Sequence, residues 1–422
     1  MNKSRYLFPM TVIGILFFVF GFVTWLNSIL IPYFKITLDL SNAESTLVTF
    51  AFFISYFVMA MPSYWVLDRI GFSNGIAGGL LVMMLGALMF IPAVWIHTYW
   101  AFLAGLFVMG AGLALLQTAV NPYVTILGPI EGAAKRISFM GIANKTAGIL
   151  SQRILGGIFL LNADAIVEKL KFMNPVERTD ELHAMAERMI NPYLVMAGCL
   201  LFLAFLVRLA RLPEVKNDEG AGESGEDKKS VWLYPNLVLG VVALFFSMGA
   251  EIIAGEYIIT YGVNIGIPMS TARFFTEYAL YGMVLGYICG TLLIPRIIKQ
   301  QHALFIFSSL GIVLAILAII TTGISSIVFV ALMGFANAIL WPAIWPLALK
   351  GIGRHTKKAS AMLIMAVSGG ALIPILFGKM LDAPNPANAF LVVIACYVVT
   401  GLYSAWGHRI SSWRGIKSQL AR

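Results

Sequence analysis

Two pairs of side chains, one of amides and one of indoles, have a spacing that would suit a binding site. Gln117 and Asn121 lie four residues apart in one apolar stretch, and Trp341 and Trp345 have the same spacing in another. Residues four apart share one face of a helix. Amides donate to and accept from hydroxyl groups, while an indole ring packs on an apolar face and its N–H donates. Facing each other, the pairs would bind a sugar; as isolated pairs, they would only fill and tie helix interfaces.

Ionisable side chains also interrupt the apolar stretches. Lys145, Glu251 and Glu256 each stand among apolar residues. In a membrane each charge would cost about 2.5–3.5 kcal/mol unless paired or hydrated, so the three are candidates for coupling to an ion. The alternative is a buried pair of Lys145 with one glutamate that only holds helices together. Arg153 and Glu277 are expected nearer an interface, where a structural role is favoured.

The composition indicates which elements position these residues. The chain of 422 residues is 59% hydrophobic and 12% charged, whereas a soluble domain is about 25% charged. A spanning helix needs about 20 mostly apolar residues. We therefore predict an all-α integral membrane protein with twelve transmembrane helices, at roughly 8–33, 46–67, 76–96, 99–127, 137–161, 191–211, 234–262, 275–298, 303–321, 324–350, 358–381 and 388–408.

The positive charge indicates topology. The formal net charge is +9, and 20 of the 29 Lys and Arg residues fall in the chain ends and in the loops on the same side as the N-terminus. The positive-inside rule then places both termini in the cytoplasm. Membrane lipid, and no nucleic acid, is the expected partner of these residues. The sequence has no phosphate-binding loop and no zinc-protease or esterase motif, so we expect no enzymatic activity and no cofactor.

The two halves of the chain repeat each other. A shift of 228 residues brings "LFFVFG" (16–21) onto "LFFSMG" (244–249), and a shift of 224 brings Gln117 onto Trp341 and Asn121 onto Trp345. We predict two six-helix halves, formed by residues 1–211 and 234–422, joined by a cytoplasmic linker at 212–233. Duplicated halves with a site at their interface are typical of transporters that work by alternating access.

Five stretches resemble the fucose/glucose–galactose branch of the major facilitator superfamily. They are "NSILIPYF" (27–34), "QTAVNPYVTILGP" (117–129), "RISFMGIANKTAG" (136–148), "FFSMGAEIIAGEYIITY" (245–261) and "VSGGALIPILFGKMLD" (367–382). The resemblance runs through both halves and is most specific in the stretch at 117–129. It implies the twelve-helix major facilitator fold and a bacterial inner-membrane symporter of a sugar, driven by protons or sodium.

The resemblance also implies site residues, with two departures. Gln117, Asn121 and Asn144 would hydrogen-bond the sugar, with Asn27 adjacent and with Trp341 or Trp345 stacking from the other half. Ser28 stands where the family has an aspartate, and Gln117 stands where it has a glutamate. In L-fucose permeases these two carboxylates are associated with proton coupling. Since an amide or a hydroxyl of this kind does not titrate, that scheme does not transfer to this chain.

Three options for coupling stay open. The protein would be a uniporter, or it would bind sodium near Asn27 and Ser28, or it would carry a proton on Glu251 or Glu256. The offset of 228 residues places Glu256 opposite Ser28, so the acid missing from the first helix reappears at the mirrored place in the seventh. We favour a cation-coupled symporter that uses one of these glutamates, with the choice between proton and sodium open.

Two classes of substrate and one gate are consistent with the sequence. The substrate would be a hexose like glucose, galactose or fucose, or an N-acetylated derivative. The runner-up is a sugar acid, with Lys145 or Arg153 as its counter-ion. "DRIGFSNG" (68–75) resembles the superfamily loop between helices two and three, so Asp68 and Arg69 are expected to act in gating. We expect a monomer.

Overall fold

The predicted all-helical fold is confirmed. The computed structural model describes residues 4–126, 133–210, 231–410 and 413, and within these ranges its regular elements are helices, without a strand. The helices of the first half are α1 (Ser4–Trp25), α2 (Asn27–Thr37), α3 (Asn42–Ile96), α4 (Tyr99–Ile126), α5 (Ala133–Phe159), α6 (Ala163–Leu170), α7 (Pro175–Glu187) and α8 (Ile190–Ala210). Of the predicted linker at 212–233, residues 212–230 lie outside the described residues, and Val231–Leu233 form a short 3-10 helix.

The second half supplies the remaining helices. They are α9 (Pro235–Glu256), α10 (Ile258–Asn264), α11 (Met269–Ala272), α12 (Phe275–Leu293), α13 (Gln300–Ile320), α14 (Gly323–Asn337), α15 (Leu340–Leu349), α16 (Thr356–Met365), α17 (Gly369–Leu381) and α18 (Phe390–Ala405).

The described helices account for twelve membrane crossings. Ten segments, some of them two helices in succession, are long and apolar enough to span a membrane. One of these, α3, has 55 residues and changes direction at Gly71, whose φ of 78° favours glycine, so it crosses twice. The 19-residue α12 adds the remaining crossing.

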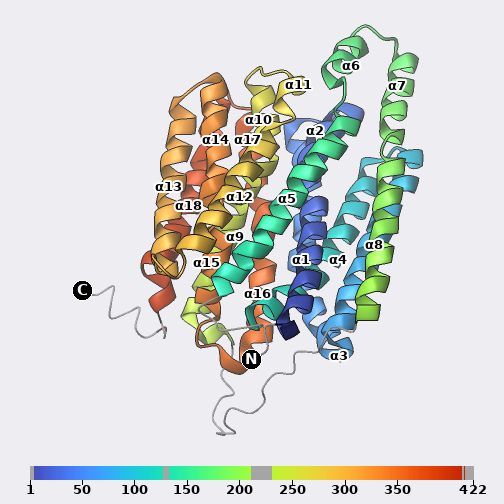
Figure 1. The fold of residues 1–422 in the computed structure, drawn as a ribbon. Coiled ribbons are helices and arrows are strands. Elements are labelled where there is room, and N and C mark those ends of the chain that lie inside the picture. The colour runs from blue at the N-terminus through green and yellow to red at the C-terminus, as the bar shows by residue number, and fades with distance from the viewer. Residues whose placement is uncertain (1–3, 127–132, 211–230, 411–412, 414–422) are drawn as a thin grey trace.

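The helices form two groups that meet along a seam (Figure 1). In the first group α3 packs on α4 and α8, and α1 packs on α5. In the second, α12 packs on α14, α13 packs on α18, and α17 packs on α9. Across the seam α5 packs on α12 and α3 packs on α17. A cavity at this seam is therefore bordered by both groups.

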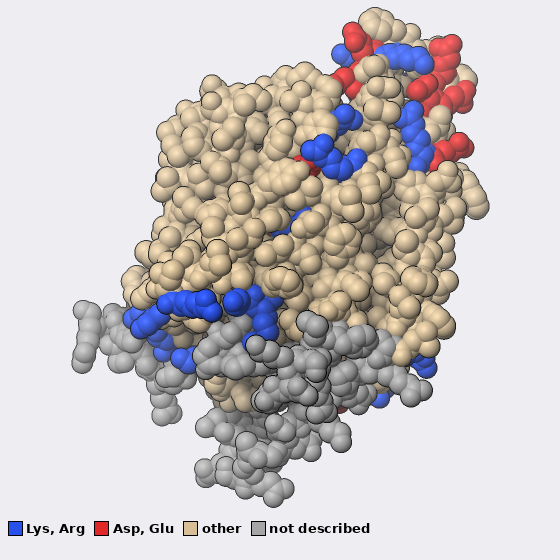
Figure 2. All heavy atoms as spheres, in the orientation of Figure 1, with Lys and Arg blue, Asp and Glu red and all other residues tan. Residues whose placement is uncertain are grey.

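The molecule has two distinct polar ends. We call the end where α1 begins and α18 ends the terminal side, and the end that carries α6 and α7 the loop side (Figure 1). Figure 2 shows Asp and Glu side chains mixed with Lys and Arg on the loop side, mainly Lys and Arg along the terminal side, and a wide band of mostly other residues between them. Apolar side chains are exposed in this band, for example Phe202, Leu292 and Val313. A lipid-facing surface of a membrane protein has this distribution.

Two crossings are interrupted at matching places in the two halves. The first crossing stops being regular between Trp25 and Asn27, where α1 gives way to α2, and the seventh at Tyr257, between α9 and α10. In each case a freed backbone carbonyl is bonded by a side chain: Trp25 O by Ser28 Oγ at 2.8 Å, and Gly255 O by Thr276 Oγ1 at 2.7 Å. Interrupted helices of this kind are where transporters place substrate and ion sites.

Candidate functional site

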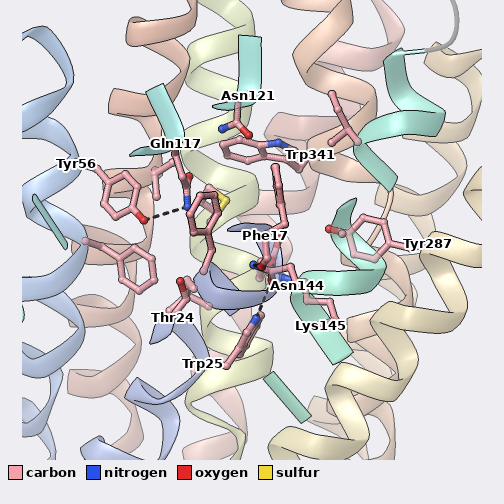
Figure 3. A pocket seen from close by; sticks show the side chains of 18 residues that line it. Phe17, Thr24, Trp25, Tyr56, Gln117, Asn121, Asn144, Lys145, Tyr287 and Trp341 are labelled. Carbon is pink, nitrogen blue, oxygen red and sulfur yellow. Dashed lines mark hydrogen bonds and ion pairs between the residues drawn. The ribbon is translucent and has the colours of Figure 1, made fainter. Parts of the chain in front are cut away.

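A cavity lies at the seam between the two halves (Figure 3). Its wall combines helices α1, α3, α4 and α5 of the first half with α9, α12 and α15 of the second. The polar and aromatic members of the wall include Thr24, Trp25, Tyr56, Gln117, Asn121, Asn144, Lys145, Glu251, Tyr287 and Trp341. A site shared in this way changes shape whenever the halves move relative to each other.

The predicted amides Gln117, Asn121 and Asn144 all border the cavity. Gln117 donates from Nε2 to the Tyr56 hydroxyl at 3.2 Å (Figure 3). Asn144 accepts from Trp25 Nε1 at 3.3 Å and donates to the Phe17 carbonyl at 3.3 Å. These bonds hold two of the amides in fixed orientations before any ligand binds.

The close approach of α1 and α5 explains the position of Asn144. A Cβ atom added at Gly21 would lie 1.8 Å from the Asn144 carbonyl oxygen. Only glycine allows the two backbones to come this close. The amide of Asn144 is thereby brought within reach of both Phe17 and Trp25 on α1.

The two tryptophans of α15 take different places. Their rings are stacked, with centroids 5.3 Å apart and planes at 24°. Trp341 borders the cavity, whereas Trp345 is fully buried and is absent from the cavity wall. Trp341 therefore presents an indole from the second half to the same space that Asn121 borders from the first (Figure 3), and Trp345 stacks on Trp341 outside the cavity wall.

A charged pair crosses the seam at the edge of the cavity. Lys145 Nζ of α5 lies 2.6 Å from Glu251 Oε1 of α9, and both side chains are buried. The ammonium also lies 4.4 Å from the centroid of the Trp25 ring. Each buried charge has its compensating partner in the other half, so the pair neutralises itself in this conformation.

Asn27 and Ser28 lie in the buried start of α2, away from the cavity wall. The Ser28 hydroxyl donates to the Trp25 carbonyl and accepts from Gln152 Nε2 at 2.7 Å. Gln152 donates to that carbonyl as well, at 2.5 Å. Because Ser28 already makes two hydrogen bonds, it stabilises the helix interruption and is poorly suited to hold a sodium ion in this conformation.

Several of these residues were not singled out from the sequence. Gln152 stands in an apolar stretch seven residues after Lys145, so its amide was a detectable signal. Tyr56, Trp25 and Tyr287 gave no such signal, because aromatic residues are common in membrane helices. The hydrogen-bond partners of Tyr56 and Trp25 come from other crossings.

The remaining predicted residues lie outside the cavity. Glu256 is fully buried in the seam and accepts a hydrogen bond from Thr49 at 3.4 Å. Arg153, a mostly exposed residue, pairs with Glu277 at 2.6 Å across the seam. Asp68 and Arg69 are exposed on α3 just before its turn at Gly71, and their role in gating stays a prediction.

Polar contacts join the halves on the loop side. Asn42 Nδ2, at the start of α3, donates to Asp382 Oδ1 at the end of α17, at 2.6 Å. The Asp164 carboxylate on α6 accepts the backbone N–H groups of Met269 and Ser270, each at 2.8 Å. The cavity lies between these contacts and the terminal side, because its wall includes Ile137, near the start of α5 on the terminal side.

Known proteins are similar to this chain in sequence over almost its full length. A glucose/galactose transporter of Brucella abortus (strain 2308) is 34% identical over 413 residues, which cover 97% of this chain and 96% of that protein. The L-fucose-proton symporter of Escherichia coli (strain K12) is 28% identical over 418 residues, which cover 96% and 94%. Both relatives are transporters.

The fold is similar to solved structures as well. The crystal structure of FucP, a Major Facilitator Superfamily transporter, in the outward conformation has a TM-score of 0.75 and 26% sequence identity, and the match covers 95% of this chain and 99% of that one. The sequence model of the family described as Major Facilitator Superfamily matches residues 13–375. With its twelve crossings in two groups and a cavity at their seam, the chain belongs to the major facilitator superfamily.

Proposed function

We propose that this protein is a secondary active transporter that moves a hexose together with a cation by alternating access. The carrying observation is the wall of the cavity, in which Gln117, Asn121 and Asn144 of the first half face Trp341 of the second. The relatives named for glucose/galactose and L-fucose transport support a neutral sugar such as glucose, galactose or fucose, and an N-acetylated derivative would suit the same amide groups.

The chemistry of the wall suits a pyranose. Amide groups donate to and accept from ring hydroxyls, and the face of an indole packs on the C–H groups of the sugar ring. Because amides and indole come from different halves, a bound sugar bridges the seam. A ligand that contacts both halves favours the conformations in which they close around it, as alternating access requires.

The contacts on the loop side fit one end of the transport cycle. The Lys and Arg residues of the terminal side support a cytoplasmic location for both termini. In a bacterial inner membrane the loop side would then face outward. Opening to the outside would break the bonds of Asn42 to Asp382 and of Asp164 to Met269 and Ser270.

The arrangement of charges favours a neutral sugar over a sugar acid. An anionic substrate needs a cation that is not already neutralised. Lys145 is bound to Glu251 at 2.6 Å, and Arg153, outside the cavity, is bound to Glu277 at 2.6 Å. A sugar acid would have to displace one of these carboxylates, at a cost that a neutral hexose avoids.

The test is counterflow of labelled sugar in proteoliposomes. Glucose, galactose, fucose, N-acetylglucosamine and glucuronate would be compared as trans substrates, and exchange of a neutral hexose in preference to glucuronate is expected. Uphill accumulation is then measured under an imposed sodium gradient and, separately, under an imposed pH gradient. Absence of exchange with every sugar contradicts the proposed function, and accumulation under neither gradient leaves a uniporter.

A further inference from the structure

Glu256 differs from every other acidic residue of the seam in its surroundings. It is the last residue of α9, at the interruption of the seventh crossing, and it is 0% exposed. Its Oε2 accepts from Thr49 Oγ1 of the first half at 3.4 Å, and its Oε1 has no hydrogen-bond partner among the described residues. A fully buried carboxyl group with one long hydrogen bond is a rare and costly arrangement.

The neighbouring acid, Glu251, is already neutralised. It lies one and a half turns earlier on α9 and forms the 2.6 Å pair with Lys145. Lys145 and Glu251 are the charged groups that act on Glu256 electrostatically. Since Lys145 is bound to Glu251 and no ion pair of the described residues includes Glu256, Glu256 has no cation of its own within the described part of the chain.

An ionised carboxylate in such a place needs a compensating positive charge. A sodium ion would require several oxygen ligands at short range, and among the described residues Thr49 provides the only hydrogen-bonding oxygen, at 3.4 Å. A proton requires no further ligand, because it binds to the carboxylate oxygen itself. The surroundings of Glu256 therefore suit a proton better than a metal ion.

We infer that Glu256 is the residue that binds the transported proton, an inference that rests on the proposed function as a symporter. A Glu256 oxygen takes the proton from a hydronium ion when the seam opens on the loop side, releasing water. It returns the proton to water when the seam opens on the terminal side further than in this conformation, in which Glu256 is 0% exposed. No other bond forms or breaks. Separation of the halves changes the access of water, because Thr49 and Glu256 belong to different halves.

Tyr56 links this site to the cavity. Its hydroxyl accepts from Gln117 Nε2 at 3.2 Å, and it lies on α3 seven residues after Thr49, which donates to Glu256. Tyr56 itself borders the cavity, whereas Glu256 does not. A sugar that binds to Gln117 therefore changes the contacts of α3, the same helix that donates to Glu256, and symport needs such a connection between the two sites.

The test compares Glu256→Gln with wild type in proteoliposomes. Glutamine reproduces the shape of the protonated acid but cannot release a proton. We expect Glu256→Gln to retain sugar counterflow, to lose uphill accumulation under a pH gradient, and to lose the current that accompanies sugar uptake. Glu187→Gln, which changes an exposed glutamate of α7, is the matched control and is expected to keep all three.

The possible outcomes distinguish a failure of the inference about Glu256 from a failure of the proposed function. Accumulation by Glu256→Gln under a pH gradient would overturn the inference, and so would wild-type accumulation under a sodium gradient but not a pH gradient. Absence of counterflow in the wild type would instead contradict the proposed function. If Glu256→Gln does not assemble, Glu256→Asp is expected to remain coupled with an altered pH of half-maximal uptake; an unaltered pH profile would also overturn the inference.

Discussion

The interruptions of the first and seventh crossings both have a backbone carbonyl that is bonded by a side chain, but they differ in whether an ionisable residue is present. In the first, the freed Trp25 carbonyl is bonded by Ser28 and Gln152, which are neutral. In the second, the Gly255 carbonyl is bonded by Thr276, and the adjacent residue is the acid Glu256. The duplicated architecture thus carries a neutral, structural interruption in one half and an ionisable one in the other.

The same division extends to the cavity. The first half contributes the amides Gln117, Asn121 and Asn144, and the second contributes Trp341 and the acid Glu251. Lys145 is the exception, because it lies in the first half and is bound to an acid of the second. The comparison implies that substitution of the amides in the first half alters sugar affinity or stability, while substitution of Glu256 in α9 alters coupling.

The largest expected effect comes from breaking the charged pair that crosses this division. Glu251→Gln leaves the Lys145 ammonium buried without its carboxylate, and we expect a loss of about 3–5 kcal/mol in the free energy of unfolding. Thermal unfolding in detergent, followed by tryptophan fluorescence, measures it. The double variant Lys145→Met with Glu251→Gln should recover most of the loss; a double variant as unstable as the single one would contradict the pairing.

The next effect distinguishes the two interruptions directly. Gln152→Ala removes the amide that donates to Ser28 and to the Trp25 carbonyl; Ser28 still bonds that carbonyl, but the Ser28 oxygen loses its donor, and leaving a buried acceptor unpaired costs about 1–3 kcal/mol. The melting temperature should fall while accumulation per pH unit stays the same in the protein that remains folded. A change in coupling equal to that of Glu256→Gln would show that the first interruption is not merely structural.

A third prediction concerns the amides of the first half. Gln117→Ala and Asn121→Ala should each lower sugar affinity by about 1–3 kcal/mol, because a buried hydroxyl of the sugar loses its partner. Binding is measured by quenching of tryptophan fluorescence or by calorimetry. Coupling to the cation should survive in whichever variant still transports. Unchanged binding in both variants would remove these amides from the sugar site.

The smallest expected effect concerns His97, which lies outside the membrane. It distinguishes the pH dependence of stability from the pH dependence of coupling. Burial and the neighbouring His183, whose ring is stacked at 3.9 Å, hold the pKa of His97 below its usual value. Below the usual pKa the unfolded chain binds a proton that the folded protein does not, so this contribution to stability is present at neutral pH and is lost as the pH falls below about 6.5. His97→Gln should flatten the acid side of the melting-temperature profile slightly.

The same variant is also tested for transport, measured as uptake driven by a pH gradient. His97→Gln should leave uptake driven by a pH gradient unchanged, since His97 lies at the loop-side end of α3, away from the cavity wall. An altered coupling ratio in His97→Gln would indicate that the loop side, and not only α9, takes part in proton movement.

The sequence determined the parts of this protein that depend on local rules. Helix length and apolar composition predicted the twelve crossings, and a spacing of four placed Gln117 and Asn121 on one helix face, where both border the cavity. The matched stretches at 27–34 and 117–129 indicated the family, which the match over residues 13–375 confirmed. These properties follow from hydrogen bonds within a helix and from the thickness of a membrane.

The tertiary structure decided which groups meet across the seam. From the sequence, the partner of Lys145 could be a glutamate of the seventh or the eighth helix. The packing of the two halves brings its ammonium to Glu251 and leaves Glu256 with Thr49. The sequence also left open which of the two tryptophans borders the cavity. The packing of α15 places Trp341 in the cavity wall and buries Trp345. The rotation and depth of one helix against another are set by side-chain fit over its whole length, so no local pattern in α5, α9 or α15 contained them.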